Sequence, residues 1–276
     1  MFDKAGGFRS IVGKEITIMP QLAVQLFTLR DYCKTPADIA STFKRLSEMG
    51  WGAVQVSAIG EIAPKELKKI LDDTGLKCVA THVRPPARLW DDPAGVIDEH
   101  AVLECPLTAV GGHFPKGEDW CEANWQGFVD KYNAAAKNFA GTSLRIGYHN
   151  HSHELARVGD PLNSPTALQF LVDKLTPDVW FEIDTYWIAH GGGSPAAWLR
   201  ALAGRVPLIH VKDMGIKPDR TQYMMEVGAG NLDWPGILAA SEAAGVETWC
   251  VEQDTCWRDP FDSLKTSLEN LKAMGL

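Results

Sequence analysis

The chain has 276 residues, a formal net charge of −8 and a hydrophobic content of 45%, values typical of a globular protein with a large core. Its acidic balance argues against nucleic-acid binding, which depends on basic surfaces. No apolar run approaches the roughly 20 residues that a membrane-spanning helix needs, so we expect no membrane association.

The six cysteines show no CxxC spacing, and Cys78 and Cys250 lie in apolar segments, where a free thiol behaves as a small hydrophobic group. We therefore expect reduced cysteines and a cytoplasmic protein. Residues 1–18 contain five charged residues and no apolar signal-peptide core. We expect an N-terminal arm over residues 1–18 and a single domain over residues 19–276.

Apolar segments with strand-like alternation take turns with segments of helical periodicity along the whole chain. In chain order they are strand 22–27, helix 36–48, strand 53–57, helix 64–74, strand 78–83, helix 93–103, strand 107–113, helix 122–139, strand 144–150, helix 165–175, strand 179–184, helix 195–202, strand 206–213, helix 234–244, strand 248–254 and helix 260–274. Such alternation indicates parallel strands, and eight units fit an α/β fold, the (β/α)8 TIM barrel. An open doubly wound sheet is the alternative, but no GxGxxG follows the first strand.

Polar residues gather at the carboxyl ends of the predicted strands, where TIM barrels carry their active sites. The densest segment is YHNHSHE (148–154), with three imidazoles and a carboxylate. Imidazole and carboxylate are usual ligands of divalent metals, and the fifth to eighth strands each end in such a group. The sequence therefore predicts a shared metal site. The polar residues at strand ends are Gln25, His82, His113, His149, His151, Glu182, Asp184, His210, Lys212, Asp213, Glu252 and Asp254.

Aromatic residues also follow the predicted strand ends. An aromatic face can cover the C–H side of a sugar ring, although such residues can equally pack loops or a subunit interface. Basic residues in these loops are isolated rather than clustered, which favours an unphosphorylated substrate. The tryptophans concerned are Trp90, Trp120, Trp187 and Trp257.

Six segments carry a resemblance to a known family: VQLFTLRD (24–31), YHNHSHE (148–154), FEIDTYW (181–187), HVKDM (210–214), VGAGNLDW (227–234) and VEQD (251–254). As a set they resemble the sugar phosphate isomerase/epimerase family, of the xylose-isomerase-like TIM barrel type. The resemblance implies one divalent cation, with manganese as first choice and magnesium, cobalt or zinc as alternatives. By the same resemblance, the ligand positions are His149, Asp184, His210 and Glu252, and a homo-oligomer is expected.

One position departs from the family pattern. Sugar epimerases of this family commonly have a glutamate where this chain has His149, and a coordinated imidazole is a poor proton acceptor. We therefore expect Glu252 as one acid/base group and His151 as the other, with His149 beside them. For His82 and His113, a core or loop-ordering role is the alternative to substrate contact, and for Lys212 it is a salt bridge. The expected substrate-binding residues are His82, His113, Lys212, Gln25, Trp187 and Trp257.

The resemblance implies a metal-dependent isomerase or epimerase that acts on a keto- or aldose sugar through an enediolate. A lyase or dehydratase that eliminates from a keto-inositol or a 3-keto-glycoside, including deglycosylation, is the alternative, which the two histidines His149 and His151 favour. Some relatives of that kind work with a small partner subunit. A barrel DNA-repair nuclease is disfavoured by the acidic charge and the small number of ligands. A non-catalytic sugar-binding barrel would leave the acid/base groups unexplained.

Overall fold

The computed structural model describes residues 20–276, so the expected arm at residues 1–18 lies outside the described residues. Eight parallel strands close into a barrel in the order β1-β10-β7-β6-β5-β4-β3-β2, which confirms the predicted single-domain TIM barrel. The barrel strands are β1 (Gln21–Gln25), β2 (Ala53–Val56), β3 (Lys77–His82), β4 (Leu107–Val110), β5 (Arg145–His149), β6 (Trp180–Asp184), β7 (Leu208–Val211) and β10 (Thr248–Val251).

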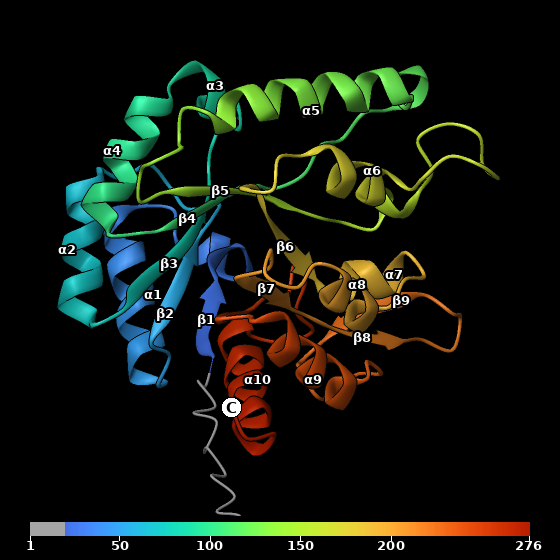
Figure 1. Cartoon of the computed structure of the whole chain (residues 1–276). Coiled ribbons are helices and arrows are strands. Elements are labelled where there is room, and N and C mark those ends of the chain that lie inside the picture. The colour runs from blue at the N-terminus through green and yellow to red at the C-terminus, as the bar shows by residue number, and fades with distance from the viewer. Residues whose placement is uncertain (1–19) are drawn as a thin grey trace, which may run out of the picture.

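Helices surround this barrel, and the last of them lies close to the first strand (Figure 1). Sequence signals set several of their ends: Thr35 and Asp38 form a capping box, and Gly75 ends α2 in the left-handed conformation. The helices are α1 (Pro36–Glu48), α2 (Pro64–Thr74), α3 (Arg88–Asp91), α4 (Pro93–Leu103), α5 (Glu122–Ala136), α6 (Ala167–Lys174), α7 (Thr185–His190), α8 (Pro195–Ala201), α9 (Trp234–Ala244) and α10 (Pro260–Ala273), with short 3-10 helices η1 (Leu26–Tyr32), η2 (Gly117–Asp119) and η3 (His153–Leu155).

The inside of the barrel changes from apolar to polar along the strands. A small cluster of buried apolar residues, including Ala23, Ala53, Trp180 and Cys250, is separate from the large core between strands and helices. Side chains alternate faces along a strand, so the residue two positions further on points the same way. On β6 this period places Glu182 and then Asp184 after Trp180. The apolar residues thus form a floor, and the polar residues above it face the carboxyl end of the barrel.

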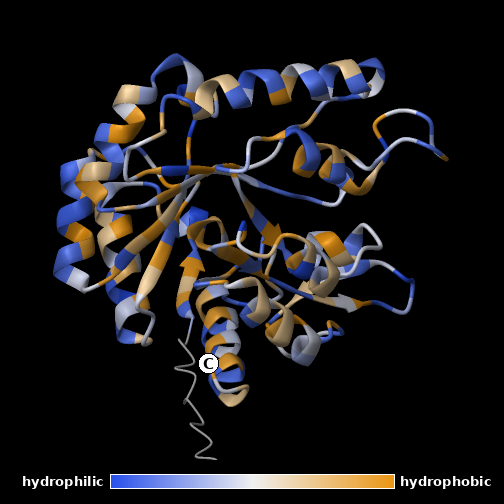
Figure 2. Cartoon of the chain, viewed as in Figure 1, coloured by the Kyte–Doolittle hydropathy of each residue, from blue (hydrophilic) through white to orange (hydrophobic). Residues whose placement is uncertain are grey.

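The floor is tightly packed. A Cβ atom added to Gly147 would lie 2.3 Å from the indole ring of Trp180, so only glycine fits beside that ring. Figure 2 shows hydrophobic residues dominating the strands, whereas the surrounding helices carry both hydrophobic and hydrophilic residues. The pairing between neighbouring strands fixes which polar side chains lie next to one another above this floor.

The observed elements differ from the predicted ones mainly after the strands. Strand β4 ends at Val110 rather than at residue 113, because the chain turns at Gly112, which has a φ of 123°. The segment after β7 is not a plain loop, since β8 (Asp213–Ile216) and β9 (Gln222–Met225) form an antiparallel hairpin there. Helix α7, also not predicted, begins where the Asp184 side chain accepts a hydrogen bond from the backbone of Trp187.

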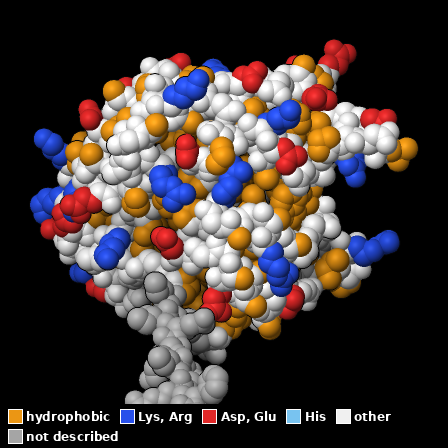
Figure 3. All heavy atoms as spheres, viewed as in Figure 1, with side chains coloured by type: hydrophobic (Ala, Val, Ile, Leu, Met, Phe, Trp, Pro, Cys, Tyr) orange, Lys and Arg blue, Asp and Glu red, His pale blue; other side chains and the backbone are white. Residues whose placement is uncertain are grey.

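Charged side chains of both signs are interspersed over the face shown in Figure 3. That pattern offers no continuous basic surface on this face. Between residues 20 and 276, no helix combines the length and the apolar character that crossing a bilayer would require.

Candidate metal centre

Strand pairing brings the polar residues of neighbouring strands side by side. His149 on β5 pairs with Glu182 on β6, and Asp184 on β6 pairs with His210 on β7. His210 also lies opposite Cys250 on β10, two residues before Glu252. Because the barrel is narrow, these side chains meet across its interior.

Asp184, His210 and Glu252 form what we call the ligand cluster, whose donor atoms lie within 4.8 Å of one another. His210 Nδ1 is 3.0 Å from Glu252 Oε2 and 3.6 Å from Asp184 Oδ2. Within the described chain, His210 Nδ1 and Asp184 Oδ2 are buried and make no hydrogen bond of regular geometry, although Asp184 Oδ2 lies 3.0 Å from Lys212 Nζ. Two carboxylates and an imidazole that converge in a buried place are the donor set of a divalent cation site.

His149 adjoins the ligand cluster without belonging to it. Its ring lies 4.3 Å from the His210 ring, centroid to centroid, but its donor atoms group with His82, Glu182 and His210. The structure therefore brings three of the four predicted ligands together and places the fourth beside them.

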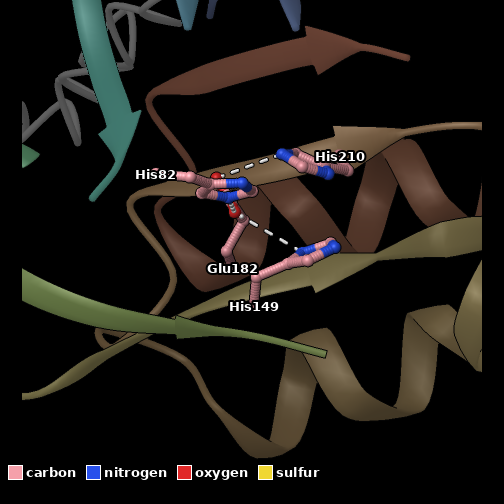
Figure 4. Close-up of side chains that lie close together, drawn as sticks. All are labelled: His82, His149, Glu182 and His210. Carbon is pink, nitrogen blue, oxygen red and sulfur yellow. Dashed lines mark hydrogen bonds and ion pairs between the residues drawn. The ribbon is translucent and has the colours of Figure 1, made fainter. Parts of the chain in front are cut away.

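Glu182 lies at the centre of a second group, the imidazole cluster, formed with His82, His149 and His210 (Figure 4). Its Oε2 is 2.5 Å from His82 Nε2 and 3.4 Å from His149 Nδ1. Its Oε1 is 3.2 Å from His210 Nε2 and accepts a 2.7 Å hydrogen bond from Gln55 Nε2. Sequence analysis named Glu182 only among the polar residues at strand ends and did not name Gln55, although Glu182 shares the inward face of β6 with Asp184.

Lys212 supplies a buried positive charge next to the ligand cluster. Its Nζ lies 3.0 Å from Asp184 Oδ2, 2.8 Å from Glu252 Oε2 and 2.9 Å from Asp254 Oδ1. Burial alone would lower the pKa of Lys212, but these carboxylates raise it well above its ordinary value. The salt bridge considered for Lys212 at the sequence level is thus present, and it involves three acids.

The same charges decide the protonation of the candidate ligands. Burial alone would raise the pKa of Glu252, but Lys212 and His210 lower it well below its usual range, so Glu252 is ionised. Burial, reinforced by positive charge on neighbours such as His210, lowers the pKa of His149 well below its ordinary value. His149 is therefore neutral and keeps a lone pair.

A cavity of about 400 Å³ opens above these groups at the carboxyl end of the barrel. Its volume suits a ligand of monosaccharide size. Burial and the charge of Lys212 lower the pKa of His151 to about 3, so its imidazole enters this cavity neutral. The polar residues that line the cavity are Ser57, His82, Arg84, His149, His151, Lys212, Glu252 and Asp254.

Two of the expected substrate contacts lie outside the cavity lining. Gln25 is fully buried, and its Oε1 accepts a 3.1 Å hydrogen bond from the backbone of Phe27. His113 bonds Asn124 Oδ1 through Nε2 at 2.7 Å and stacks on Phe128. The alternative considered for His113, ordering of its loop, matches these contacts.

The two expected tryptophans line an adjoining groove instead. Trp187 and Trp257 border it together with Tyr186, Tyr223 and Asp254, and Asp254 also borders the main cavity. Trp187 lies nearer the metal centre, with its ring 5.4 Å from that of His151, whereas Trp257 is 62% exposed.

Glu154 orders the segment that carries His151. Its Oε1 accepts a 2.7 Å hydrogen bond from the Tyr148 hydroxyl, and its Oε2 accepts one of 2.8 Å from the backbone of His151. Burial raises the pKa of Glu154 to about 7. The carboxylate of the histidine-rich motif is thus an internal support for His151 rather than part of the cavity lining.

Asp213 performs a similar task for the loop after the β8–β9 hairpin. Its carboxylate accepts hydrogen bonds from the backbone of Met214, Gly228, Gly230 and Leu232 and from Trp234 Nε1, at 2.7 to 3.3 Å. Gly228 and Gly230 of the VGAGNLDW segment therefore donate their backbone N–H groups to the carboxylate of Asp213, which orders this loop.

Replacing Asp213 by asparagine should lower the free energy of unfolding by about 1–3 kcal/mol, because the new amide turns N–H donors toward other N–H donors. Thermal unfolding followed by circular dichroism measures this loss. The exposed Asp219, on the hairpin turn, gives the matched control, and an unchanged midpoint for Asp213→Asn would contradict the assignment.

A closed eight-stranded barrel with carboxylates and imidazoles converging at the carboxyl ends of its strands defines the class: a TIM barrel with a candidate metal centre. The chain belongs to the xylose isomerase-like TIM barrel family, whose model matches residues 43–274. The predicted family is thereby confirmed.

Individual relatives are distant. An inosose dehydratase of Clostridium beijerinckii is 23% identical over 158 residues, which are 51% of this chain and 51% of that protein. The chain thus aligns with about half the length of that curated relative. A sugar phosphate isomerase/epimerase structure from Parabacteroides distasonis superimposes with a TM-score of 0.77 at 23% identity, covering 94% of this chain and 96% of that one. The IOLI protein, solved with a bound zinc atom, gives 0.68 at 12% identity, covering 92% and 97%.

Proposed function

We propose that the chain is a divalent-metal-dependent isomerase or epimerase of a keto- or aldose sugar. The observation that carries this proposal is the ligand cluster: two buried carboxylates, Asp184 and Glu252, converge with the buried imidazole of His210 so that their donor atoms lie within 4.8 Å of one another. Two carboxylates and an imidazole suit manganese, with magnesium, cobalt or zinc as alternatives. His149 adjoins the cluster as the fourth candidate ligand.

When bound, the cation supplies electrostatic stabilisation of the negative charge that develops as an enediolate forms. Glu252 is ionised and borders the cavity, so it can take the proton from the carbon next to the substrate carbonyl. The positive charge of Lys212 offsets the mutual repulsion of Asp184, Glu252 and Asp254 and holds these carboxylates close together. His151 enters the cavity as a neutral imidazole and can accept or return the second proton.

Elimination is the second candidate outcome of the same first step. One observation favours it: Glu252 and Asp254 line the cavity together with the imidazoles of His82, His149 and His151, rather than with a second glutamate from β5. Such an asymmetric pair of groups can remove a proton and protonate a leaving oxygen. The similarity to an inosose dehydratase is consistent with a keto-inositol or related keto-sugar as substrate.

Removal of the cation should abolish the activity. We expect no turnover of a sugar and keto-sugar panel after treatment with EDTA, and recovery on addition of Mn²⁺, because the enediolate charge is then again stabilised. Elemental analysis of the treated protein is the control. A fully metal-free protein that retains its rate would contradict the proposal.

The same panel separates the candidate outcomes. Incorporation of solvent deuterium at carbon without loss of water indicates isomerisation or epimerisation. A new enone absorbance or a released aglycone indicates elimination. Nicking of abasic DNA would instead support the nuclease that the net charge disfavours.

A further inference from the structure

We propose that Glu182 is a positioning residue that fixes the ring orientation and the tautomer of the imidazoles around the cation site, and thereby sets its affinity for a divalent metal. The inference rests on the metal centre of the proposed function. It concerns a residue that need not touch either the metal or the substrate.

The contacts of Glu182 determine where the protons of the imidazoles lie. A carboxylate accepts hydrogen bonds, so each ring nitrogen that faces it at bonding distance carries a proton. His82 Nε2 at 2.5 Å meets that condition. His149 Nδ1 lies 3.4 Å from the same oxygen but makes no hydrogen bond of regular geometry with it. The His82 nitrogen that faces Glu182 is therefore a donor, and Glu182 is the carboxylate nearest to His149 Nδ1.

Gln55 gives an independent reason for the same assignment at His210. Its amide nitrogen donates to Glu182 Oε1 at 2.7 Å, and its amide oxygen lies 2.8 Å from His210 Nε2. An amide oxygen also requires a donor, which places a proton on His210 Nε2. His210 Nδ1 faces Asp184 and Glu252 and is the nitrogen that would bind a cation.

In His149 the two nitrogens have the opposite arrangement. Its Nδ1 lies on the Glu182 side, and its ring also borders the cavity, so Nε2 is the nitrogen that remains for a cation or a substrate. A single carboxylate thus faces one nitrogen of each of two neighbouring candidate ligands. Hydrogen bonds to the second nitrogen of a metal-binding histidine orient the ring and strengthen the ligand.

The burial of Glu182 supports a functional reason for its charge. Its side chain is fully buried beneath the metal centre, where an ionised group is costly unless it is paired. Both carboxylate oxygens are paired, Oε2 with His82 Nε2 and Oε1 with Gln55 Nε2 and His210 Nε2. An apolar side chain would fill this position without that cost.

Glu182→Gln is the central test, because it preserves the shape and replaces one oxygen by an N–H donor. If the amide nitrogen replaces Oε2, His82 and His149 lose their acceptor; if it replaces Oε1, His210 and Gln55 lose theirs. In either case the proton of an affected imidazole is expected to move to the ring nitrogen that should bind the metal. We expect the affinity for Mn²⁺ and Co²⁺ to fall about 10- to 100-fold. The measurement is a chelator-competition titration, with the visible spectrum of the Co²⁺-loaded protein as a second readout.

Glu226→Gln is the matched control, since Glu226 is also a buried glutamate but bonds Ser263 and Arg258 outside both clusters. It should leave metal affinity and the Co²⁺ spectrum unchanged. Glu182→Asp should recover part of the affinity because it restores the acceptor charge. A purely structural role of Glu182 would instead shift the unfolding midpoint of the metal-free protein without changing the Co²⁺ spectrum.

Should Glu182→Gln fail to fold, Gln55→Met tests the same idea, because it removes the amide that links His210 Nε2 to Glu182 Oε1. We expect it also to weaken metal binding. Wild-type affinity in Glu182→Gln, or in Gln55→Met when only that variant folds, overturns the positioning role. Failure of the wild-type protein itself to bind Mn²⁺ or Co²⁺ would instead overturn the proposed function.

Discussion

Glu252→Gln should lower kcat by about 10³-fold or more while the protein remains folded. General acid/base groups typically contribute about 10²- to 10⁴-fold, and Glu252 is expected to act both as such a group and as a ligand. Its Oε2 lies 3.0 Å from His210 Nδ1 and 2.8 Å from Lys212 Nζ, so an amide at this position removes the anionic oxygen from both contacts. The volume of the side chain is almost unchanged.

Steady-state kinetics at saturating Mn²⁺ measure this loss, because saturation separates the proton-transfer role from weakened metal binding. Circular dichroism verifies the fold. Glu247→Gln is the matched control, since Glu247 is an exposed glutamate just before β10, the strand that leads to Glu252. Near-native turnover of Glu252→Gln would refute the acid/base assignment.

The sequence was informative about the ligand cluster for a physical reason. In a parallel barrel, every strand ends at the same rim, so polar residues at strand ends must come together. The strand-end positions therefore predicted a common site without any distance, and the family resemblance selected His149, Asp184, His210 and Glu252 as its ligands. The structure places Asp184, His210 and Glu252 together and His149 beside them.

Glu182 was harder to identify because its position is one step deeper in the barrel. At the sequence level, a glutamate in a strand is compatible with a simple ion pair, and its partners His82 and Gln55 are far away in the chain. A usable signal was nevertheless present: Glu182 and Asp184 are two residues apart, so both must face the barrel interior. Two consecutive inward acids in a buried strand require buried partners.

His113 shows where strand boundaries limit such an argument. Extending the fourth strand to residue 113 put an imidazole at the rim, but the strand ends at Val110 and Gly112 turns the chain. Alternation alone does not reveal this end, because the turn depends on a glycine conformation rather than on hydrophobicity. The hairpin of β8 and β9 was missed for a related reason, since strands of four residues carry too little periodicity.

Lys212→Met should destabilise the metal-free protein by about 3–5 kcal/mol, the usual cost of removing one partner from a buried ion pair. Lys212 is 1% exposed and faces three acids, Asp184, Glu252 and Asp254. Methionine keeps most of the aliphatic stem, so the loss reports the charge rather than the packing. The three carboxylates would then repel one another in a medium that screens poorly.

A divalent cation should reverse much of this loss, which distinguishes a metal centre from a purely structural cluster. Binding to the folded state raises stability, and the carboxylates of Lys212→Met lack the competing ammonium. We therefore expect Mn²⁺ to raise the unfolding midpoint of Lys212→Met more than that of the wild-type protein. Lys217→Met is the matched control, because Lys217 lies over the Trp257 ring, away from the ligand cluster. Equal shifts in Lys212→Met and the wild-type protein would show that Lys212 and the cation do not share these carboxylates.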